Sequence, residues 1–372
     1  MIANPQKDYI FIPSIESHYY CFEPLVNEMT KRGFNAIQYR IPEIITHRRE
    51  FGGNKTGNNL VEISLVEFLL FIDTWDNKPV ICVGNDSDPG TCKIIYKCKK
   101  LGCKIVLIQD GWLDARNINN PIYTKSGLYY SIKAKLHKLA TASFMPTKKY
   151  FHNFIGQNAD YFLSYSSLAK KNFELAGVKS EKVFITGSIR HHKLKMEEKS
   201  SKSIYPQKNE VIVIFTNLIL NEDDKRNFEE IFSWINNVFI NKTIVIKVHP
   251  MENMGNYSSF IDSNVIIEKC HIKELLEKYK VIFSFCFAST VVFDMLVLNI
   301  PVVQLAPNNL IKKMTNYYSD LSLAESFEQF KEVVSQYDIT FQKRKGANYL
   351  ADIDTTFDSI DKSIVTLTEN IL

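Results

Sequence analysis

The motif Lys247-Val248-His249-Pro250 is the first candidate for chemistry, because it ends an apolar run typical of a buried strand. Pro250 lacks a backbone N–H and favours a sharp exit from that strand. The exit would present the His249 imidazole, whose nitrogens can hydrogen-bond a phosphate or ribose oxygen. Taken alone, the motif is equally compatible with a histidine that only caps a turn.

The hydroxyl residues Ser289 and Thr290 are the second candidate. They lie between a strand-like run and an apolar helical pattern, so they fall where a helix would begin. The free N–H groups and the dipole of a first helical turn favour an anion, and two hydroxyls would complete a phosphate site there. An ordinary helix cap would explain one hydroxyl and imply no ligand.

The third candidate is Asp110 in Gln109-Asp110-Gly111, which directly follows the strand-like run 104–108. Gly111 allows a sharp turn that would leave the Asp110 carboxylate at a cleft, where it could take a proton as a general base. His18, in the loop after the first expected strand, is a rival base. A plain Asp-Gly turn is the alternative interpretation.

Short β-rich runs alternate with helical patterns along the chain, which predicts βαβ units and parallel sheets. The expected fold class is therefore α/β, with two Rossmann-like, doubly wound domains facing a cleft. The polar stretch 193–208 has no apolar periodicity and is typical of a linker. We place the domains at residues 1–195 and 209–340, followed by a helical segment over 341–372.

These patterns also give the elements that would position the candidate groups. Strands are expected at residues 9–12, 36–39, 80–83, 104–108, 161–163, 183–185, 211–215, 243–248, 265–267, 281–285 and 302–305. Helices are expected at residues 60–73, 223–238, 272–279 and 289–298, with others ahead of Gly33 and Gly102.

The composition narrows the possible functions. The chain has 372 residues, 45% hydrophobic and 23% charged, as in ordinary soluble globular proteins, which excludes disorder, collagen and coiled coils. The net charge of +4 is too weak for a dedicated nucleic-acid binder. Neither a G-x-G-x-x-G nor a G-x-x-x-x-G-K-[ST] motif occurs, which disfavours a kinase or ATPase.

The expected location is cytoplasmic. The seven cysteines are odd in number and lack zinc-site spacing, which indicates free thiols in a reducing compartment. The N-terminus does not resemble a signal peptide. The apolar stretch 281–306 is interrupted by Asp294, Asn299 and Pro301, so it is expected to be a buried strand–helix–strand rather than a membrane span.

A basic segment over residues 115–159 adds a possible membrane contact to the expected cytoplasmic location. Residues 115–159 contain no acidic residue, whereas lysines and interleaved aromatic residues are frequent. Such a segment suits an anionic membrane surface or an anionic saccharide acceptor. Single-stranded nucleic acid would use the same residue types, but no nucleic-acid motif accompanies them, and no nucleic-acid partner is expected. We expect peripheral contact with the inner face of the cell membrane through 116–154, with a solvated helix face as the alternative.

The Lys-Val-His-Pro motif and the segment from Ser289 to Val303 together resemble the donor-binding half of the GT-B glycosyltransferase superfamily. The resemblance covers residues 243–305. It is strongest to bacterial sialyltransferases and polysialyltransferases, with their His-Pro and Ser-Ser/Thr motifs. Residues 293–301 are also similar to CDP-glycerol glycerophosphotransferases. Both groups of relatives use cytidine nucleotides.

The resemblance implies an acceptor-binding first domain, a nucleotide-donor second domain, and a C-terminal segment that packs back on the first. The residues that we expect to bind the donor, at its phosphate or its base, are His249, Pro250, Ser289, Thr290, Thr216, Asn217, Glu268, Lys269 and Arg190. Arg190 lies in a Gly-Ser-x-Arg turn that resembles one in related capsule enzymes, and a structural contact between domains is an equal alternative for it.

The expected catalytic residues are Asp110, His249 and His18. The motif around Asp110 resembles the Asp/Glu-Asp/Glu-Gly motif of those sialyltransferases, whose carboxylate is the base. Gln109 departs from that motif, and His18 resembles the histidine of plant-type and antibiotic GT-B enzymes, so both bases stay open. The Asp-x-Asp at residues 86–88 lies in a first-domain turn and is expected to serve as loop or acceptor residues. Metal is not expected.

The resemblance thus implies an inverting, metal-independent glycosyltransferase with a cytidine-activated donor, CMP-sialic acid or a related acidic sugar, and no cofactor. Its partners would be that nucleotide sugar and a glycan or glycolipid acceptor, in the synthesis of a bacterial capsule, lipopolysaccharide or surface glycan. The alternatives are a CDP-glycerol or CDP-ribitol phosphotransferase, a UDP-sugar GT-B transferase or a 2-epimerase. A non-catalytic nucleotide-binding module belongs to a different class.

Overall fold

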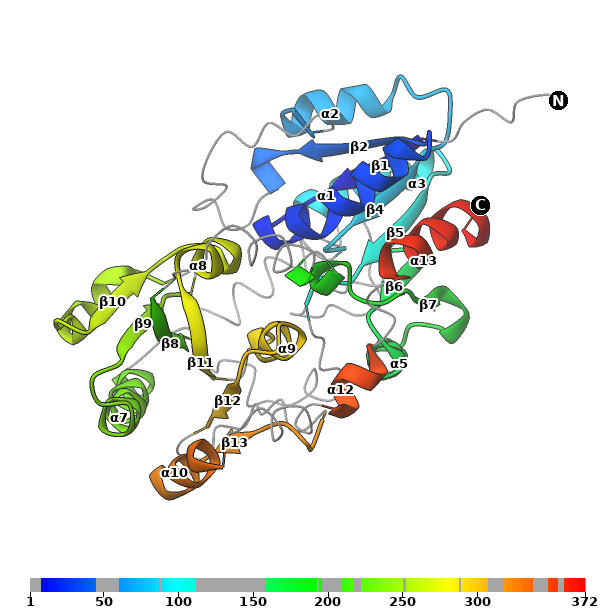
Figure 1. Ribbon diagram of the computed structural model, residues 1–372. Coiled ribbons are helices and arrows are strands. Elements are labelled where there is room, and N and C mark those ends of the chain that lie inside the picture. Colours follow the sequence, from blue (N-terminus) through cyan, green and yellow to red (C-terminus); the bar gives the residue numbers. More distant parts are fainter. Residues whose placement is uncertain are drawn as a thin grey trace. The chain divides into compact units, whose positions relative to one another are not determined.

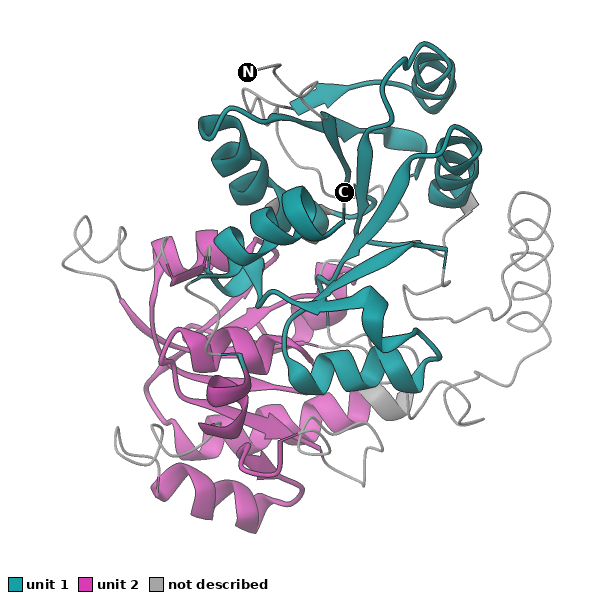
Figure 2. Cartoon of the chain, turned by 90° about the vertical axis from the view of Figure 1, so that its right-hand side faces the viewer, with its two compact units in different colours: residues 1–192, 353–372 teal, residues 193–352 magenta. Residues whose placement is uncertain are grey.

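The computed structural model divides the chain into two compact units (Figure 2). Unit 1 comprises residues 1–192 and 353–372, and unit 2 comprises residues 193–352. The residues that the structure describes are 8–44, 60–86, 89–111, 158–192, 194–195, 209–216, 222–249, 252–287, 289–306, 318–336, 347–353 and 358–371. Each unit is an α/β domain built on one parallel sheet, which confirms the expected fold class.

Unit 1 contains a seven-stranded sheet in the order β3-β2-β1-β4-β5-β6-β7 (Figure 1). All six neighbouring pairs are parallel. The strands are β1 (Asp8–Ile12), β2 (Asn35–Arg40), β3 (Leu60–Glu62), β4 (Val80–Val83), β5 (Lys104–Ile108), β6 (Tyr161–Ser164) and β7 (Val183–Ile185). Its helices are α1 (Glu16–Lys31), α2 (Leu65–Ile72), α3 (Pro89–Lys100), α5 (Ser167–Leu175) and α13 (Ser359–Val365), with 3-10 turns η1 (Pro42–Ile44) and η3 (Ser180–Lys182) and a π-helical turn η8 (Thr366–Asn370).

Strand β4 shows why this sequence forms a central strand. All four of its residues are buried, as expected for a parallel strand that is covered on both faces. Ile81 packs into the apolar core that contains Phe68 of α2, whereas Cys82 packs into the core that contains Phe22 of α1. Successive side chains therefore enter opposite layers, and helices cover both faces of the sheet.

The helix expected over residues 60–73 is wrong at its start. Leu60–Glu62 forms the edge strand β3, and α2 begins only at Leu65. Ser64 caps the helix, since its hydroxyl accepts a hydrogen bond from the Glu67 amide and the Glu67 carboxylate accepts one from the Ser64 amide. This capping box can be recognised in the sequence, and it fixes the start of α2.

Unit 2 contains a six-stranded parallel sheet in the order β10-β9-β8-β11-β12-β13 (Figure 1). The strands are β8 (Glu210–Phe215), β9 (Thr243–Lys247), β10 (Val265–Glu268), β11 (Lys280–Cys286), β12 (Val302–Leu305) and β13 (Leu323–Ala324). The helices are α7 (Glu222–Val238), α8 (Ile272–Lys278), α9 (Val291–Val297), α10 (Phe327–Ser335) and α12 (Ala347–Asp352), with the 3-10 helix η4 (Met254–Phe260). Phe228 of α7 and Phe330 of α10 share one core with Ile212, Ile246 and Phe285 of the strands.

The last part of the chain divides between the units. Helix α12 groups with unit 2, where Tyr349 stacks on Phe293 of α9 with ring centroids 4.0 Å apart. The sequence placed residues 341–352 in the segment that packs on the first domain, and this aromatic contact holds α12 elsewhere. From Ile353 onward the chain groups with unit 1, and Ile364 enters the same core as Phe22.

Within the described ranges, no helix is both long enough and apolar enough to cross a bilayer.

Candidate active-site groups in the two units

The carboxyl ends of β1, β4 and β5 bring the candidate groups of unit 1 together. The three strands are neighbours, and Ile12 pairs with Val83, which pairs in turn with Leu107. His18 follows β1 and Asp110 follows β5, so both lie beyond the same edge of the sheet. In open parallel sheets this edge is where ligands bind.

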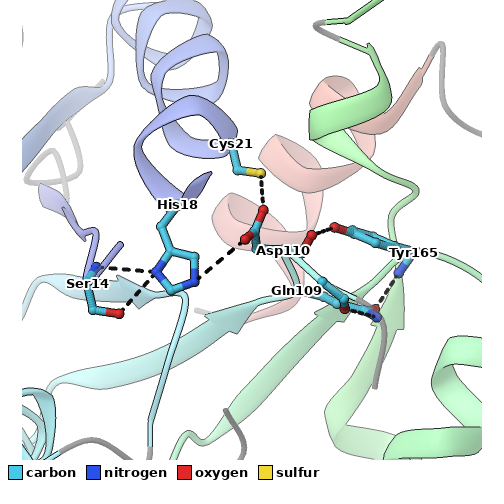
Figure 3. A network of polar contacts seen from close by, with 7 residues as sticks. Ser14, His18, Cys21, Gln109, Asp110 and Tyr165 are labelled. Carbon is cyan, nitrogen blue, oxygen red and sulfur yellow. Dashed lines mark hydrogen bonds and ion pairs between the residues drawn. The ribbon is translucent and has the colours of Figure 1, made fainter. Parts of the chain in front are cut away.

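The two rival bases lie next to each other (Figure 3). His18 Nε2 is 3.9 Å from Asp110 Oδ2, and Cys21 Sγ donates a hydrogen bond of 3.0 Å to the other carboxylate oxygen, Oδ1. The side chains of His18 and Asp110 are only 2% and 9% exposed. The sequence left the choice between them open, and the structure joins them in one network.

The partners of His18 fix its tautomer. The Ser14 amide N–H donates to His18 Nδ1 at 3.3 Å, and the Ser14 hydroxyl oxygen lies 3.1 Å from the same nitrogen (Figure 3). Because an amide can only donate, Nδ1 carries a lone pair, and the proton of the neutral ring lies on Nε2, facing Asp110. Nε2 therefore faces Asp110 at 3.9 Å with its N–H and has no lone pair with which to accept a proton from a substrate.

Gly84, the first residue after β4, makes room for this arrangement. A Cβ atom at Gly84 would lie 2.4 Å from Cγ and Nδ1 of His18, closer than atoms can approach. The residue after the middle strand must therefore be glycine for the imidazole to fit there. Phe22 packs on the same ring, with centroids 6.1 Å apart. Gly84 was not predicted as a site residue, and its only signal in the sequence is a glycine directly after an apolar run.

Gln109 holds the loop that carries Asp110. Its amide nitrogen donates to the Gly111 carbonyl at 2.9 Å, and its amide oxygen accepts from the Tyr165 amide at 3.0 Å. The Tyr165 hydroxyl also donates to the main-chain carbonyl of Asp110 (Figure 3). Both ends of the Gln109 side chain are thus committed to fixing this loop.

In unit 2, the carboxyl ends of β9, β8 and β11 present the expected donor-binding residues. Lys247 of β9 and Cys286 of β11 both pair with Phe215 of β8, so the three strands end level. His249 and Ser289 follow the two outer strands and lie at the same edge of the sheet. Because adjacent strands are about 4.8 Å apart, those outer strands are separated by about 10 Å. Asn217 and Pro250 lie outside the described residues.

A chain of hydrogen bonds joins the segments that follow β8, β9 and β10. The His249 amide donates to Thr216 Oγ1 at 2.8 Å, and that hydroxyl donates to Glu252 Oε2 at 2.5 Å. Glu252 is only 4% exposed and was not singled out from the sequence. Tyr257 donates to the other carboxylate oxygen of Glu252, and Lys269 Nζ donates to the main-chain carbonyl of Glu252.

The hydroxyls beyond β11 differ in their partners. Ser289 Oγ accepts a hydrogen bond from the Val291 amide at 3.3 Å, which is a local capping contact at the start of α9. Thr290 occupies the N-cap position but makes no side-chain capping bond. The helix begins at Val291, two residues later than expected.

The remaining expected donor-binding residues are held within their own units. Both carboxylate oxygens of Glu268 lie 3.1 Å from Lys278 Nζ, and Tyr279 donates to one of them. This hydrogen bond to Glu268 raises the pKa of Lys278. Arg190 belongs to unit 1 and is half-buried in the helical turn that follows β7.

Asp86 has a structural position. It is fully buried, and its Oδ2 accepts hydrogen bonds from the amides of Asn158 and Ala159 at 2.7 and 2.8 Å. It therefore ties the chain entering β6 to the loop after β4. Asp88 and the basic segment 116–154 lie outside the described residues. Within the described part of the chain, no group of three or more His, Cys, Asp or Glu residues has metal-binding geometry.

The chain matches the model of a known protein family. The model of glycosyltransferase family 52 matches residues 71–308. This range includes Asp110 of unit 1 and Thr216, His249 and Ser289 of unit 2. No curated protein sequence matches the chain significantly.

Solved structures share the fold over nearly the whole chain. UDP-GlcNAc 2-epimerase from Methanocaldococcus jannaschii, in complex with UDP-GlcNAc and UDP, is 13% identical with a TM-score of 0.63, covering 97% of this chain and 99% of that one. The Neisseria meningitidis enzyme bound to UDP-GlcNAc is 14% identical, with a TM-score of 0.59 and coverage of 96% and 98%. The wall teichoic acid polymerase TagF is 12% identical, with a TM-score of 0.59 and coverage of 98% and 89%. At these identities the likeness shows the GT-B fold alone.

Proposed function

The chain belongs to glycosyltransferase family 52, and from that membership we propose an inverting transfer of an acidic sugar from a cytidine-activated donor to a glycan or glycolipid acceptor. The preferred donor is CMP-sialic acid. The family and the GT-B fold make the chain a glycosyltransferase, and the resemblance of residues 243–305 to cytidine-using enzymes supports this donor.

One observation carries the proposal, the pairing of Asp110 with His18 at the carboxyl edge of the first sheet. A general base must be unprotonated and held in place when the acceptor arrives. The Cys21 thiol and the His18 Nε2–H both face the Asp110 carboxylate, and Gln109 and Tyr165 fix its backbone. Asp110 is therefore the base that we propose, and His18 is its positioning residue.

The proposed reaction is a single displacement. The acceptor hydroxyl oxygen bonds to the anomeric carbon on the face opposite the phosphate, and Asp110 takes the hydroxyl proton. The bond between the anomeric carbon and the phosphate oxygen breaks, and its electron pair leaves with CMP. The configuration at the anomeric carbon is therefore inverted, and the only proton moved ends on the Asp110 carboxylate.

The departing CMP gains negative charge, which the donor-binding unit must stabilise. We assign this role to the His249 imidazole with the hydroxyls of Ser289 and Thr290, which follow level strand ends. Hydrogen bonds aimed at a developing oxyanion contribute a few kcal/mol, about 3 for one donor. Glu268 and Lys269 would lie toward the base, and Arg190 toward a donor or acceptor anion. No step in this scheme uses a metal.

The cellular role that we propose is synthesis of a bacterial capsule, lipopolysaccharide or surface glycan in the cytoplasm, with residues 116–154 contacting the inner membrane surface. A donor panel tests the chemistry. Melting temperatures with CMP, CDP, UDP and GDP are compared first, since ligand at 100 times its Kd stabilises by about 2.7 kcal/mol. Transfer from CMP-sialic acid, CDP-glycerol and UDP-GlcNAc is then followed by product mass.

We expect the largest shift with CMP and transfer only from CMP-sialic acid. Preference for UDP would overturn the donor, and glycerophosphate transfer from CDP-glycerol would overturn the reaction type. Nucleotide binding without transfer or donor hydrolysis would identify a binding module.

A further inference from the structure

The Thr216 hydroxyl lies between a backbone amide and a buried carboxylate. It accepts from the His249 N–H at 2.8 Å and donates to Glu252 Oε2 at 2.5 Å. A hydroxyl has one proton to donate, and here Glu252 receives it. Thr216 therefore has no proton left for a phosphate oxygen, and its hydroxyl acts on the protein rather than on the nucleotide.

The Glu252 carboxylate is held in one orientation from both sides. Thr216 donates to Oε2 and Tyr257 donates to Oε1 at 2.9 Å. Burial raises the pKa of the Tyr257 phenol, so it stays protonated and keeps its role as donor. A carboxylate that is 4% exposed needs such donors to offset its desolvation, and it is correspondingly costly to move.

The backbone of Glu252 closes the same turn. Its amide donates to the His249 carbonyl at 2.9 Å, and its own carbonyl accepts from Lys269 Nζ at 2.8 Å. The amide and the carbonyl of His249 are thus both tied to the Thr216–Glu252 pair. The main chain on either side of the His249 side chain is fixed before a ligand arrives.

We propose that Thr216 and Glu252 are positioning residues, which orient the His249 turn through the hydrogen-bond chain from the His249 amide to Thr216 Oγ1 to Glu252 Oε2. This inference rests on the proposed role of His249 at the departing phosphate. It adds that Thr216, expected to bind the donor, acts through His249, and it gives Glu252 a role that the sequence motifs do not suggest.

Hydrogen exchange tests the chain of bonds without using activity. In the full-length protein, NMR follows exchange of the His249 amide in wild type, Thr216→Val and Thr216→Ser. The valine variant keeps the shape of the side chain and removes the hydroxyl, whereas serine restores the hydroxyl. We expect exchange at least about tenfold faster in Thr216→Val and close to wild type in Thr216→Ser. Equal protection in Thr216→Val would overturn the proposal.

A double-mutant cycle tests the link to catalysis, with sugar transfer from CMP-sialic acid as the readout. A displacement of a catalytic group by about 1 Å can lower the reaction rate by about 100-fold. We therefore expect Thr216→Val to lower kcat by about 10-fold to 100-fold. In a His249→Ala background the same change should cost less than about twofold, since the two residues act as one unit. Equal losses in both backgrounds would show a merely structural role and overturn the proposal.

Ser284→Ala is the matched control. Ser284 is another buried hydroxyl of unit 2, and it donates to the Pro301 carbonyl, away from His249. The Ser284→Ala variant should change the melting temperature but neither kcat nor the exchange rate of the His249 amide.

If Thr216→Val does not fold, Glu252→Gln takes its place in the double-mutant cycle with the same expected pattern. A fully active His249→Ala would refute the donor assignment, whereas normal exchange in Thr216→Val would refute the positioning chain alone.

Discussion

His18 Nε2 and Asp110 Oδ2 lie 3.9 Å apart, although the two residues are 92 positions apart in the sequence. They follow strands β1 and β5, which are separated in the sheet by one other strand. Strand β4 lies between β1 and β5, and Gly84, directly after β4, leaves the space that the imidazole occupies. The Ser14 amide then directs the Nε2–H toward the carboxylate. The pair is asymmetric, because the histidine N–H faces the carboxylate across 3.9 Å and the lone pair of the ring faces Ser14.

This asymmetry predicts different results for two His18 variants. Glutamine can donate an N–H near the position of Nε2 but cannot accept a proton at neutral pH. We expect His18→Gln to keep kcat within about tenfold of wild type and His18→Ala to lose more, because alanine removes the N–H dipole that faces the Asp110 carboxylate and leaves a cavity beside it. Initial rates of sugar transfer measure both. A glutamine variant as inactive as the alanine variant would instead make His18 the base.

Gly84→Ala should disturb the same pair by crowding alone. The added methyl group would lie 2.4 Å from the His18 ring, so the ring or the strand end must shift. We expect a loss of about 1–3 kcal/mol in the free energy of unfolding and a lower kcat. Gly255→Ala is the control, because its added Cβ would lie 3.4 Å from Asn253 Oδ1, which is tolerated far better. Denaturant unfolding that leaves Gly84→Ala as stable as wild type would contradict the packing described.

Asp86→Ala should be a stability variant. The substitution leaves the buried amides of Asn158 and Ala159 without their acceptor, and an unpaired buried donor costs about 1–3 kcal/mol. Denaturant unfolding should show a loss of at least about 2 kcal/mol, equal with and without EDTA. A variant of unchanged stability that lacks an EDTA-sensitive transfer activity present in the wild type would instead give Asp86 a metal-binding role.

Much of the sheet architecture was predictable from the sequence, because both sheets are parallel and covered on both faces. Their strands are short, continuous apolar runs, and β4, β5 and β9 lie where those runs were found. The boundary of α2 was missed because helical apolar spacing was extended over the edge strand β3. The Ser64–Glu67 capping box could have corrected it.

The pairings within the candidate sites could not be predicted in the same way. His18 and Asp110 meet only because β1, β4 and β5 are adjacent, and strand order is decided by the packing of the whole sheet. Glu252 lies three residues after His249, but nothing in the local pattern shows that its carboxylate turns inward toward Thr216. The sequence could indicate where the strands end. Which residues meet across neighbouring strand ends could be seen only in the folded structure.

The role of Asp110 is tested most directly by single-turnover transfer of sialic acid from CMP-sialic acid. The transfer rates of wild type and Asp110→Asn are compared after CMP binding by both proteins has been measured. Asparagine keeps the shape and the hydrogen bond from Cys21 but cannot take the acceptor proton. We expect CMP binding to be retained and the transfer rate to fall by at least about 100-fold, the lower bound for loss of a general base. Transfer by Asp110→Asn at the wild-type rate would show that another group takes the proton.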